Sequence, residues 1–169
     1  LPQYRLIDEI NLTKIDLMWA GVEPDLESKL LTIRIPILKG LLGHRIFIIK
    51  KENQARFDNI NTLTDLKQLN AGQGTGWGDT KILKSANIPV TTTLKYSNLF
   101  YMLEGERFDY FPRAIHEPWS EIAGLPELNL VVEKKIMLVY PFAMYFFVKK
   151  DNQILHDKLH QGLEAAIKD

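Results

Sequence analysis

The sequence has no cysteine and no excess of charge of either sign. Among its 169 residues, Lys and Arg together number 21, and Asp and Glu together also number 21. The lack of cysteine excludes disulfide bridges and thiolate metal sites, and it is compatible with any redox compartment. The balance of charge argues against a nucleic-acid partner, which would require a basic surface.

Long apolar segments are also missing. The longest run, IMLVYPFAMYFFV at 136–148, is too short to cross a bilayer and has Pro141 in its middle, so it predicts two adjoining buried strands. We therefore expect a protein that does not itself span the membrane. A composition of 46% hydrophobic and 25% charged residues is sufficient for a folded core, in one domain or two small ones.

Neither common phosphate-binding loop is present, although GQGTGWGDT at 72–80 is rich in glycine. The dinucleotide motif fails because Trp77 or Asp79 occupies its last glycine position, and the other motif fails because no Gly-Lys pair exists there. The segment instead joins a strand-like stretch to a helix with Asp79 and Thr80 as candidate N-caps. Free backbone N–H groups at such a helix start suit a carboxylate or another anion. A plain surface turn is the alternative.

Catalytic and metal-binding signatures are absent as well. The sequence has no ordered Ser/His/Asp set, no HExxH and no paired-carboxylate pattern, so nothing positive predicts an enzyme. His156 and His160 stand four residues apart on the predicted last helix, but no third ligand accompanies them. We therefore expect neither a metal nor a cofactor.

Strand-like and helix-like segments alternate along the chain, which predicts an α/β fold with a largely parallel sheet. Two apolar strands that end in lysine pairs, at 45–50 and 144–149, bracket the middle of the sequence. If these two strands lie side by side, the middle forms an inserted lobe that is joined to the rest by two crossings. Such an architecture would hinge around a ligand.

The order of several segments resembles that of a known family. KIDLMWAGVEPDLESKLLTIRIPIL and GHRIFIIKK are followed by TLTDLKQLNAGQGTGW, LEGERFDYFP and YFFVKKDNQILHDKLHQGLEAAIKD. This order is similar to that of the type 2 periplasmic solute-binding proteins, and closest to the polar amino-acid family of ABC transporters. The resemblance implies a periplasmic binding protein-like II fold, with two lobes joined by two hinge strands and a ligand cleft between them.

The resemblance also implies a division of the chain. Residues 1–51 and 144–169 correspond to lobe one without its N-terminal part, and residues 52–143 correspond to an inserted lobe two. The opening LPQYRLIDEI has no initiating Met, so we expect a processed or truncated chain, in which a missing signal peptide says nothing about location. The family's location would be the periplasm or another extracytoplasmic space.

In function, the resemblance implies capture of a small molecule for an ABC permease or a membrane sensor. An enzyme of dehydratase or lyase type on the same lobes is the main alternative. A sensory or structural domain with a vestigial cleft is another.

The sequence departs from the family at two ligand positions. Where the family's clamping arginine stands, this chain has Glu27 or Ser28, and Arg34 falls where the family has a serine. Arg113 and Ala114 stand where the family has an aspartate for the ligand's amino group. These changes favour an anionic ligand held bidentately by arginine.

The candidate ligand-binding residues come from strand ends and from the glycine-rich segment. They are Trp19, Arg34, Gly74, Thr75, Gly76, Trp77 and Arg113. For Arg34 the alternative is an exposed strand arginine, and for Trp19 it is a core side chain. If the segment serves an anion, backbone N–H groups at 74–77 and the Thr75 hydroxyl should face the ligand, with Arg113 converging on them.

Overall fold

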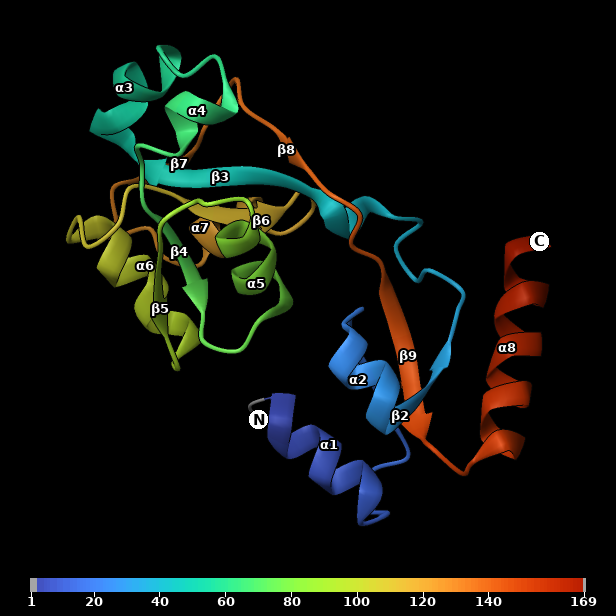
Figure 1. The fold of residues 1–169 in the computed structure, drawn as a ribbon. Helices are drawn as coiled ribbons and strands as arrows, with labels where there is room; N and C mark the ends of the chain where they lie inside the picture. Colours follow the sequence, from blue (N-terminus) through green and yellow to red (C-terminus); the bar gives the residue numbers. More distant parts are fainter. Residues whose placement is uncertain (1–2, 169) are drawn as a thin grey trace. The chain divides into compact units, whose positions relative to one another are not determined.

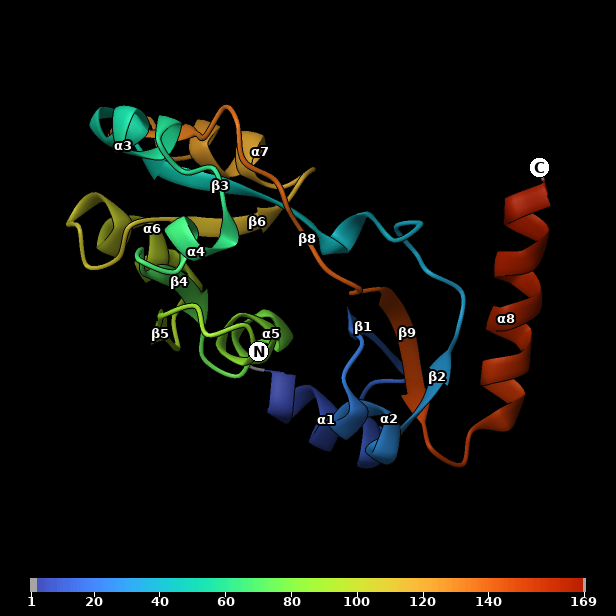
Figure 2. The same ribbon diagram turned by 45° about the horizontal axis from the view of Figure 1, so that its top comes forward.

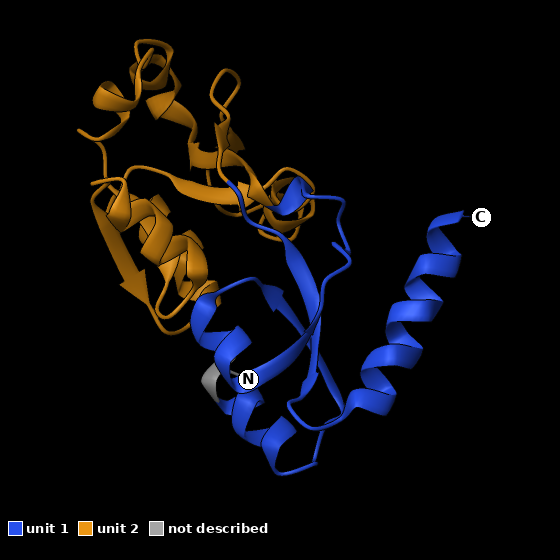
Figure 3. Ribbon diagram, turned by 45° about the vertical axis from the view of Figure 1, so that its right-hand side comes forward, with its two compact units in different colours: residues 1–42, 141–169 blue, residues 43–140 orange. Residues whose placement is uncertain are grey.

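The computed structural model describes residues 3–168 and divides the chain into two compact units (Figure 3). Unit 1 comprises Leu1–Leu42 with Pro141–Asp169, and unit 2 comprises Gly43–Tyr140. The sequence had placed the corresponding boundaries after residues 51 and 143. Residues 1, 2 and 169, which the sequence assigned to lobe one, lie outside the described residues.

Unit 1 is built on a three-stranded sheet in the order β1-β9-β2, with both pairings antiparallel (Figure 2). Its elements are α1 (Gln3–Asn11), β1 (Leu17–Gly21), α2 (Pro24–Lys29), β2 (Leu30–Ile33), the 3-10 turn η1 (Leu41–Gly43) leading to unit 2, β9 (Met144–Lys149) and α8 (Gln153–Lys168). Helices α1 and α2 pack on this sheet through a small apolar core of Ile10, Met18, Leu26, Leu30 and Phe147. Over Gln153–Lys168, α8 has no buried side chain.

Unit 2 is an α/β domain centred on β3 (Figure 1). Its elements are β3 (His44–Lys50), η2 (Lys51–Asn53), α3 (Gln54–Asp58), α4 (Leu63–Leu66), β4 (Ala71–Gly74), α5 (Gly78–Ser85), β5 (Val90–Thr93), α6 (Tyr96–Glu104), β6 (Phe111–Ala114), α7 (Pro118–Ala123), β7 (Leu130–Val132) and β8 (Leu138–Val139). Strand β3 pairs with β6, β7 and β8, while β4 pairs with β5. A bridge between Ala71 and Tyr110 ties β4 to the segment before β6.

Helices cover β3 on both of its faces. Phe47 and Ile49 join one core cluster with residues of α3, α4 and α5, whereas Ile48 joins a second cluster with residues of α6. Burial on both faces explains why Ile46–Ile49 is continuously apolar rather than alternating. Each fully buried side chain of this size contributes about 1.5–3 kcal/mol to folding.

The expected largely parallel sheet is wrong. All pairings of β3 and β9 are antiparallel, and among the described strands only β4 and β5 form a parallel ladder. The continuous apolar run that suggested a parallel strand reports only that both faces are covered. It does not determine the direction of the neighbouring strands.

The predicted pairing of the two lysine-ended strands is also wrong. Strands β3 and β9 belong to different sheets, and each is the central strand of its own sheet, which is why their compositions are alike. The chain instead enters and leaves unit 2 on β3 and β8, where His44 faces Val139 and Arg45 faces Leu138. The amide of Tyr140 donates to the carbonyl of Gly43 at 3.1 Å and extends this pairing to the boundary of the unit.

The start of helix α4 follows from local sequence. Helix α4 begins with a capping box, in which Thr62 Oγ1 accepts from the Asp65 amide at 3.1 Å and Asp65 accepts from the Thr62 amide at 2.8 Å. The carboxylate also accepts from the Asn61 amide at 3.0 Å. The Asn61 amide, then the Thr62 hydroxyl and amide, hold the pKa of Asp65 below its usual value.

Across residues 3–168, no helix is both long and apolar enough to cross a bilayer.

This capping box gives the protein a specific acid sensitivity. Because folding lowers the pKa of Asp65, its stabilising contribution is present above the unfolded-state pKa, about 3.9, and is lost as pH falls through the folded value. We expect Asp65→Asn to lower the melting temperature at pH 7 and to differ less from the unsubstituted protein at pH 3. Asp16→Asn, at an exposed position in unit 1, is the control. A deficit for Asp65→Asn that is equal at both pH values would contradict this account.

Candidate functional site

The glycine-rich segment lies at the end of β4 and the start of α5, and two of its glycines accommodate the protein's own side chains. A Cβ at Gly72 would lie 2.1 Å from the ring of Phe108, and one at Gly74 would lie 2.2 Å from the indole of Trp77. The close approach that these two glycines permit is therefore made by aromatic rings of the same chain. Gly76 differs, because its φ of +83° favours glycine and nothing lies within 4 Å of the site of a Cβ.

Two of the backbone N–H groups expected to face a ligand donate instead to carbonyl groups of the protein. The amide of Thr75 donates to the Thr93 carbonyl at 2.9 Å, and that of Trp77 donates to the Gly74 carbonyl at 3.1 Å. The hydroxyl of Thr80 also donates to the Gly74 carbonyl, at 3.0 Å, and locks the turn from inside. Thr75 and Gly76 lie at the exposed rim.

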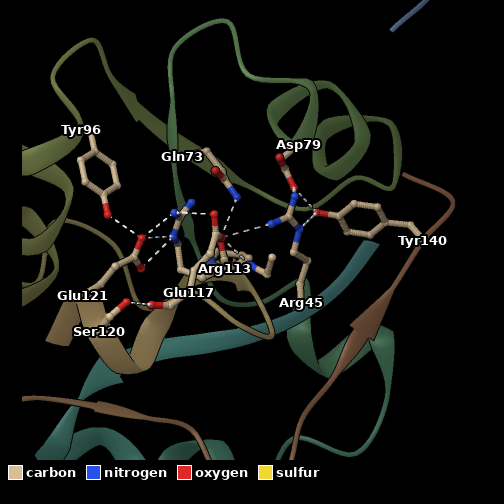
Figure 4. Close-up of polar contacts among 11 residues, drawn as sticks. Arg45, Gln73, Asp79, Tyr96, Arg113, Glu117, Ser120, Glu121 and Tyr140 are labelled. Atoms are coloured by element: carbon tan, nitrogen blue, oxygen red, sulfur yellow. Dashed lines mark hydrogen bonds and ion pairs between the residues drawn. The ribbon is translucent and has the colours of Figure 1, made fainter. Parts of the chain in front are cut away.

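Asp79 does not cap α5, contrary to the sequence expectation. The N-cap is Trp77, which makes no side-chain capping bond. The Asp79 carboxylate instead forms an ion pair with Arg45 Nη2 at 2.7 Å and accepts a short hydrogen bond from the Tyr140 hydroxyl (Figure 4). Arg45 Nε donates to the same hydroxyl at 3.1 Å. This triad joins the start of α5 to β3 and to the residue that directly follows β8.

Arg113, on β6, is held by two carboxylates of the following turn and helix. Its Nε and Nη2 contact Glu121 Oε2 at 2.9 Å and Oε1 at 2.5 Å, and Nη2 lies 3.0 Å from Glu117 Oε1. The guanidinium carbon is 5.5 Å from the centroids of the Trp77 and Tyr96 rings. Aromatic faces at this distance favour a cation.

Glu117 joins the two arginines into one network. Its Oε2 lies 3.6 Å from Arg45 Nη1 and accepts from the Ala114 amide at 2.7 Å, while its Oε1 contacts Arg113. We call this network the charged cluster: its members are Arg45, Asp79, Tyr96, Arg113, Glu117, Glu121 and Tyr140 (Figure 4). With two guanidinium groups and three carboxylates, it carries one net negative charge when all are ionised.

Burial sets the electrostatics of the charged cluster. The side chains of Arg45 and Arg113 are 3% and 10% exposed, whereas that of Glu117 is 24% exposed. Burial alone would lower the pKa of Arg113. Its contacts with Glu121 and Glu117 outweigh burial, so the pKa lies above its usual value. Burial raises the pKa of both Tyr96 and Tyr140, with the neighbouring carboxylates adding to the effect. Both phenols are therefore hydrogen-bond donors at neutral pH.

Gln73 adds an unused acceptor beside the charged cluster. The residue is 1% exposed, and its Nε2 lies 3.3 Å from the Pro112 carbonyl. Its Oε1 is buried without a hydrogen-bond partner. An orphaned buried acceptor costs about 1–3 kcal/mol, so a bound donor would satisfy a real deficit.

The seven predicted site residues fall into two groups. Gly74, Thr75, Gly76 and Trp77 come together with Arg113 in unit 2, through the contact between Trp77 and the guanidinium. Trp19 and Arg34 belong to unit 1. Trp19 is 64% exposed on β1, and Arg34 follows β2, with its Nη2 bound to Glu27 Oε1 at 2.7 Å.

Sequence reasoning missed most of the charged cluster. Arg45 was the detectable member, because a lone charge at the start of an apolar strand that is covered on both faces needs a buried partner. Glu117 was not among the predicted site residues, and Asp79 was expected to cap a helix. Tyr140 and Glu121 gave no local signal, since their partners are distant in the sequence or depend on the turn after β6.

Comparison with known proteins finds relatives in structure alone. No family profile matches the chain, and no curated protein sequence matches it. An ancestral arginine-binding protein bound to glutamine superposes with a TM-score of 0.72 at 20% identity, over 99% of this chain and 72% of that one. A truncated, arginine-bound ArgBP from T. maritima gives 0.72 at 18% identity, over 98% and 74%.

A third match is an ancestral amino-acid-binding protein described as a precursor of cyclohexadienyl dehydratase. It has a TM-score of 0.67 at 17% identity, over 96% of this chain and 68% of that one. The chain has the type 2 periplasmic binding protein fold. The resemblance noted in the sequence is thus confirmed at the level of fold. At these identities the periplasmic binding protein fold is shared without fixing a ligand.

The packing of Trp77 over Gly74 gives a direct test of the site's construction. Gly74→Ala places a Cβ 2.2 Å from the indole, so the ring must move. We expect a loss of about 1–3 kcal/mol in the free energy of unfolding and a changed tryptophan emission.

Gly162→Ala is the matched control, because nothing lies within 4 Å of that position in α8. There the added methyl group should be neutral or stabilising by about 0.5–1 kcal/mol. Unchanged stability and emission in Gly74→Ala would show that the indole does not occupy this place.

Proposed function

We propose that the chain is the ligand-binding part of an extracytoplasmic solute-binding protein. It captures a small polar solute, anionic or amino-acid-like, and delivers it to an ABC permease or a membrane sensor. The single observation that carries this proposal is the buried charged cluster at the end of β4 and β6, on a fold shared with proteins described as binding arginine or glutamine. Ligands of α/β folds commonly bind at such strand ends.

The contacts of the charged cluster favour an amino-acid-like ligand over a simple anion. Arg113 Nη1 has no carboxylate partner among the described residues, so it remains for a ligand carboxylate, together with the Thr75 hydroxyl and the turn at Gly76. Glu117 and the Gln73 acceptor complement a ligand ammonium. A purely anionic ligand would meet a cluster that already has an excess carboxylate.

An enzyme of dehydratase type is a second candidate, because one matched structure is described as a precursor of such an enzyme. Glu117 is the most exposed carboxylate of the charged cluster and would be its acid or base. Turnover separates the two candidates: a binding protein returns its ligand unchanged, whereas an enzyme forms product in the same mixture.

Calorimetry tests the proposal with arginine, glutamine, glutamate and succinate as probes. We expect at least one amino acid to bind without turnover, and succinate to bind more weakly. Arg113→Lys keeps the charge but loses the planar fork, which should cost about 1.5–3 kcal/mol, a tenfold to hundredfold weakening.

Gly76→Ala should also weaken binding, because φ of +83° disfavours a side chain. Gly40→Ala is the matched control, since Gly40 has φ of +85°, open surroundings and a place in unit 1. If Arg113→Lys, Gly76→Ala and Gly40→Ala all bind with the affinity of the unsubstituted protein, the charged cluster is not the binding site. If none of the four probes binds, or if one of them is converted to product, the binding-protein proposal is overturned.

A further inference from the structure

Two histidines form a pair on α8, which belongs to unit 1, whereas the charged cluster belongs to unit 2. His156 and His160 are one helical turn apart, a spacing that places both on the same face. Their rings are stacked, with centroids 6.1 Å apart and an interplanar angle of 29°. The side chains are 18% and 38% exposed, so solvent reaches both.

A carboxylate lies beside the Nδ1 atom of each ring. His156 Nδ1 is 2.8 Å from Asp157 Oδ1, and His160 Nδ1 is 3.8 Å from Glu164 Oε1. The Gln153 amide donates to the same Asp157 oxygen at 2.7 Å and holds that carboxylate in place. Gln153 Nε2 also lies 3.2 Å from His156 Nδ1, but the charged Asp157 carboxylate is nearer. An ionised carboxylate only accepts hydrogen bonds, so at His156 it favours the tautomer with the proton on Nδ1 and the lone pair on Nε2. Glu164 is beyond hydrogen-bond distance of His160 and acts on that ring through its charge alone.

This arrangement is the one that supports metal-ligating histidines, which donate one ring N–H to a carboxylate and bind the ion through the other nitrogen. We propose that His156 and His160 bind one divalent transition-metal ion through their Nε2 atoms. Asp157 orients the His156 ring, and both Asp157 and Glu164 add negative charge near the ion. The sequence predicted no metal for want of a third ligand; the carboxylate held against His156 is what the structure adds.

The site is open rather than closed. Among residues 3–168, no group of three or more His, Cys, Asp or Glu side chains is placed to hold a metal ion. Water therefore completes the coordination, and the ion is exchangeable. Imidazole ligands suit Cu²⁺, Ni²⁺ and Zn²⁺, with Cu²⁺ bound most tightly, whereas Mg²⁺ prefers oxygen ligands.

Calorimetric titration of the whole chain with CuCl₂, NiCl₂, ZnCl₂ and MgCl₂ tests this site without any solute. We expect one ion per chain, the tightest binding for Cu²⁺ and none for Mg²⁺. His156→Asn and His160→Asn should each abolish binding at this site. His116→Asn is the matched control, because His116 is exposed in unit 2, and it should bind as the unsubstituted protein does.

Asp157→Asn tests the positioning role separately, because it leaves both rings in place. Loss of such an outer carboxylate typically weakens metal affinity by about tenfold to a hundredfold. Electron paramagnetic resonance of the Cu²⁺ complex should show two imidazole nitrogens, and neither histidine variant should give this signal.

Several results would overturn the site. These are a stoichiometry of zero, tight binding that persists in His156→Asn and His160→Asn, loss of binding in His116→Asn, or equal binding of Mg²⁺. Unchanged affinity in Asp157→Asn would refute the role of the carboxylate. None of these outcomes depends on whether the charged cluster binds a solute, so the two proposals fail separately.

Discussion

The contact of Glu117 with two buried arginines is the interaction on which unit 2 depends. Arg45 comes from β3 and pairs with Asp79, Arg113 comes from β6 and pairs with Glu121, and Glu117 is the carboxylate that lies between these two buried like charges. Transfer of such ions from water costs several kcal/mol each, and their pairing repays that cost only when the geometry is good. The charged cluster therefore adds little net stability when complete, whereas removing one partner costs about 3–5 kcal/mol.

A cluster that adds little stability invites a functional explanation. An apolar replacement of similar volume often folds as well or better. The charged cluster also ties together Arg45, on the strand through which the chain enters unit 2, and Tyr140, which directly follows the strand through which it leaves.

The sequence predicted the elements better than their partners. The strands expected at 45–50 and 144–149 are confirmed as β3 and β9, and the expected last helix is confirmed as α8, because such elements depend on neighbouring residues. Strand direction and the pairing of β3 were wrong, because both depend on contacts between distant segments. The periodicity and burial of apolar residues identify a central strand, but they do not show which strands pair with it.

The same distinction explains the candidate site. The glycine run was recognised as a place of close approach, but local sequence does not show what approaches it. Phe108, which is distant in the sequence, covers Gly72, and Trp77 folds back onto Gly74. Arg113 was found through the resemblance to a family. Its partners Glu117 and Glu121 follow within eight residues, yet only the turn after β6 brings them to the guanidinium.

The central claim is that a small solute binds at the charged cluster of unit 2. Amide chemical-shift mapping tests it most directly, using whichever of arginine, glutamine, glutamate or succinate binds most tightly. The account predicts shifts concentrated in residues 73–80, 111–121 and at Tyr140, with unit 2 elsewhere little changed. Shifts confined to other parts of unit 2, with the charged cluster silent at saturation, would contradict it.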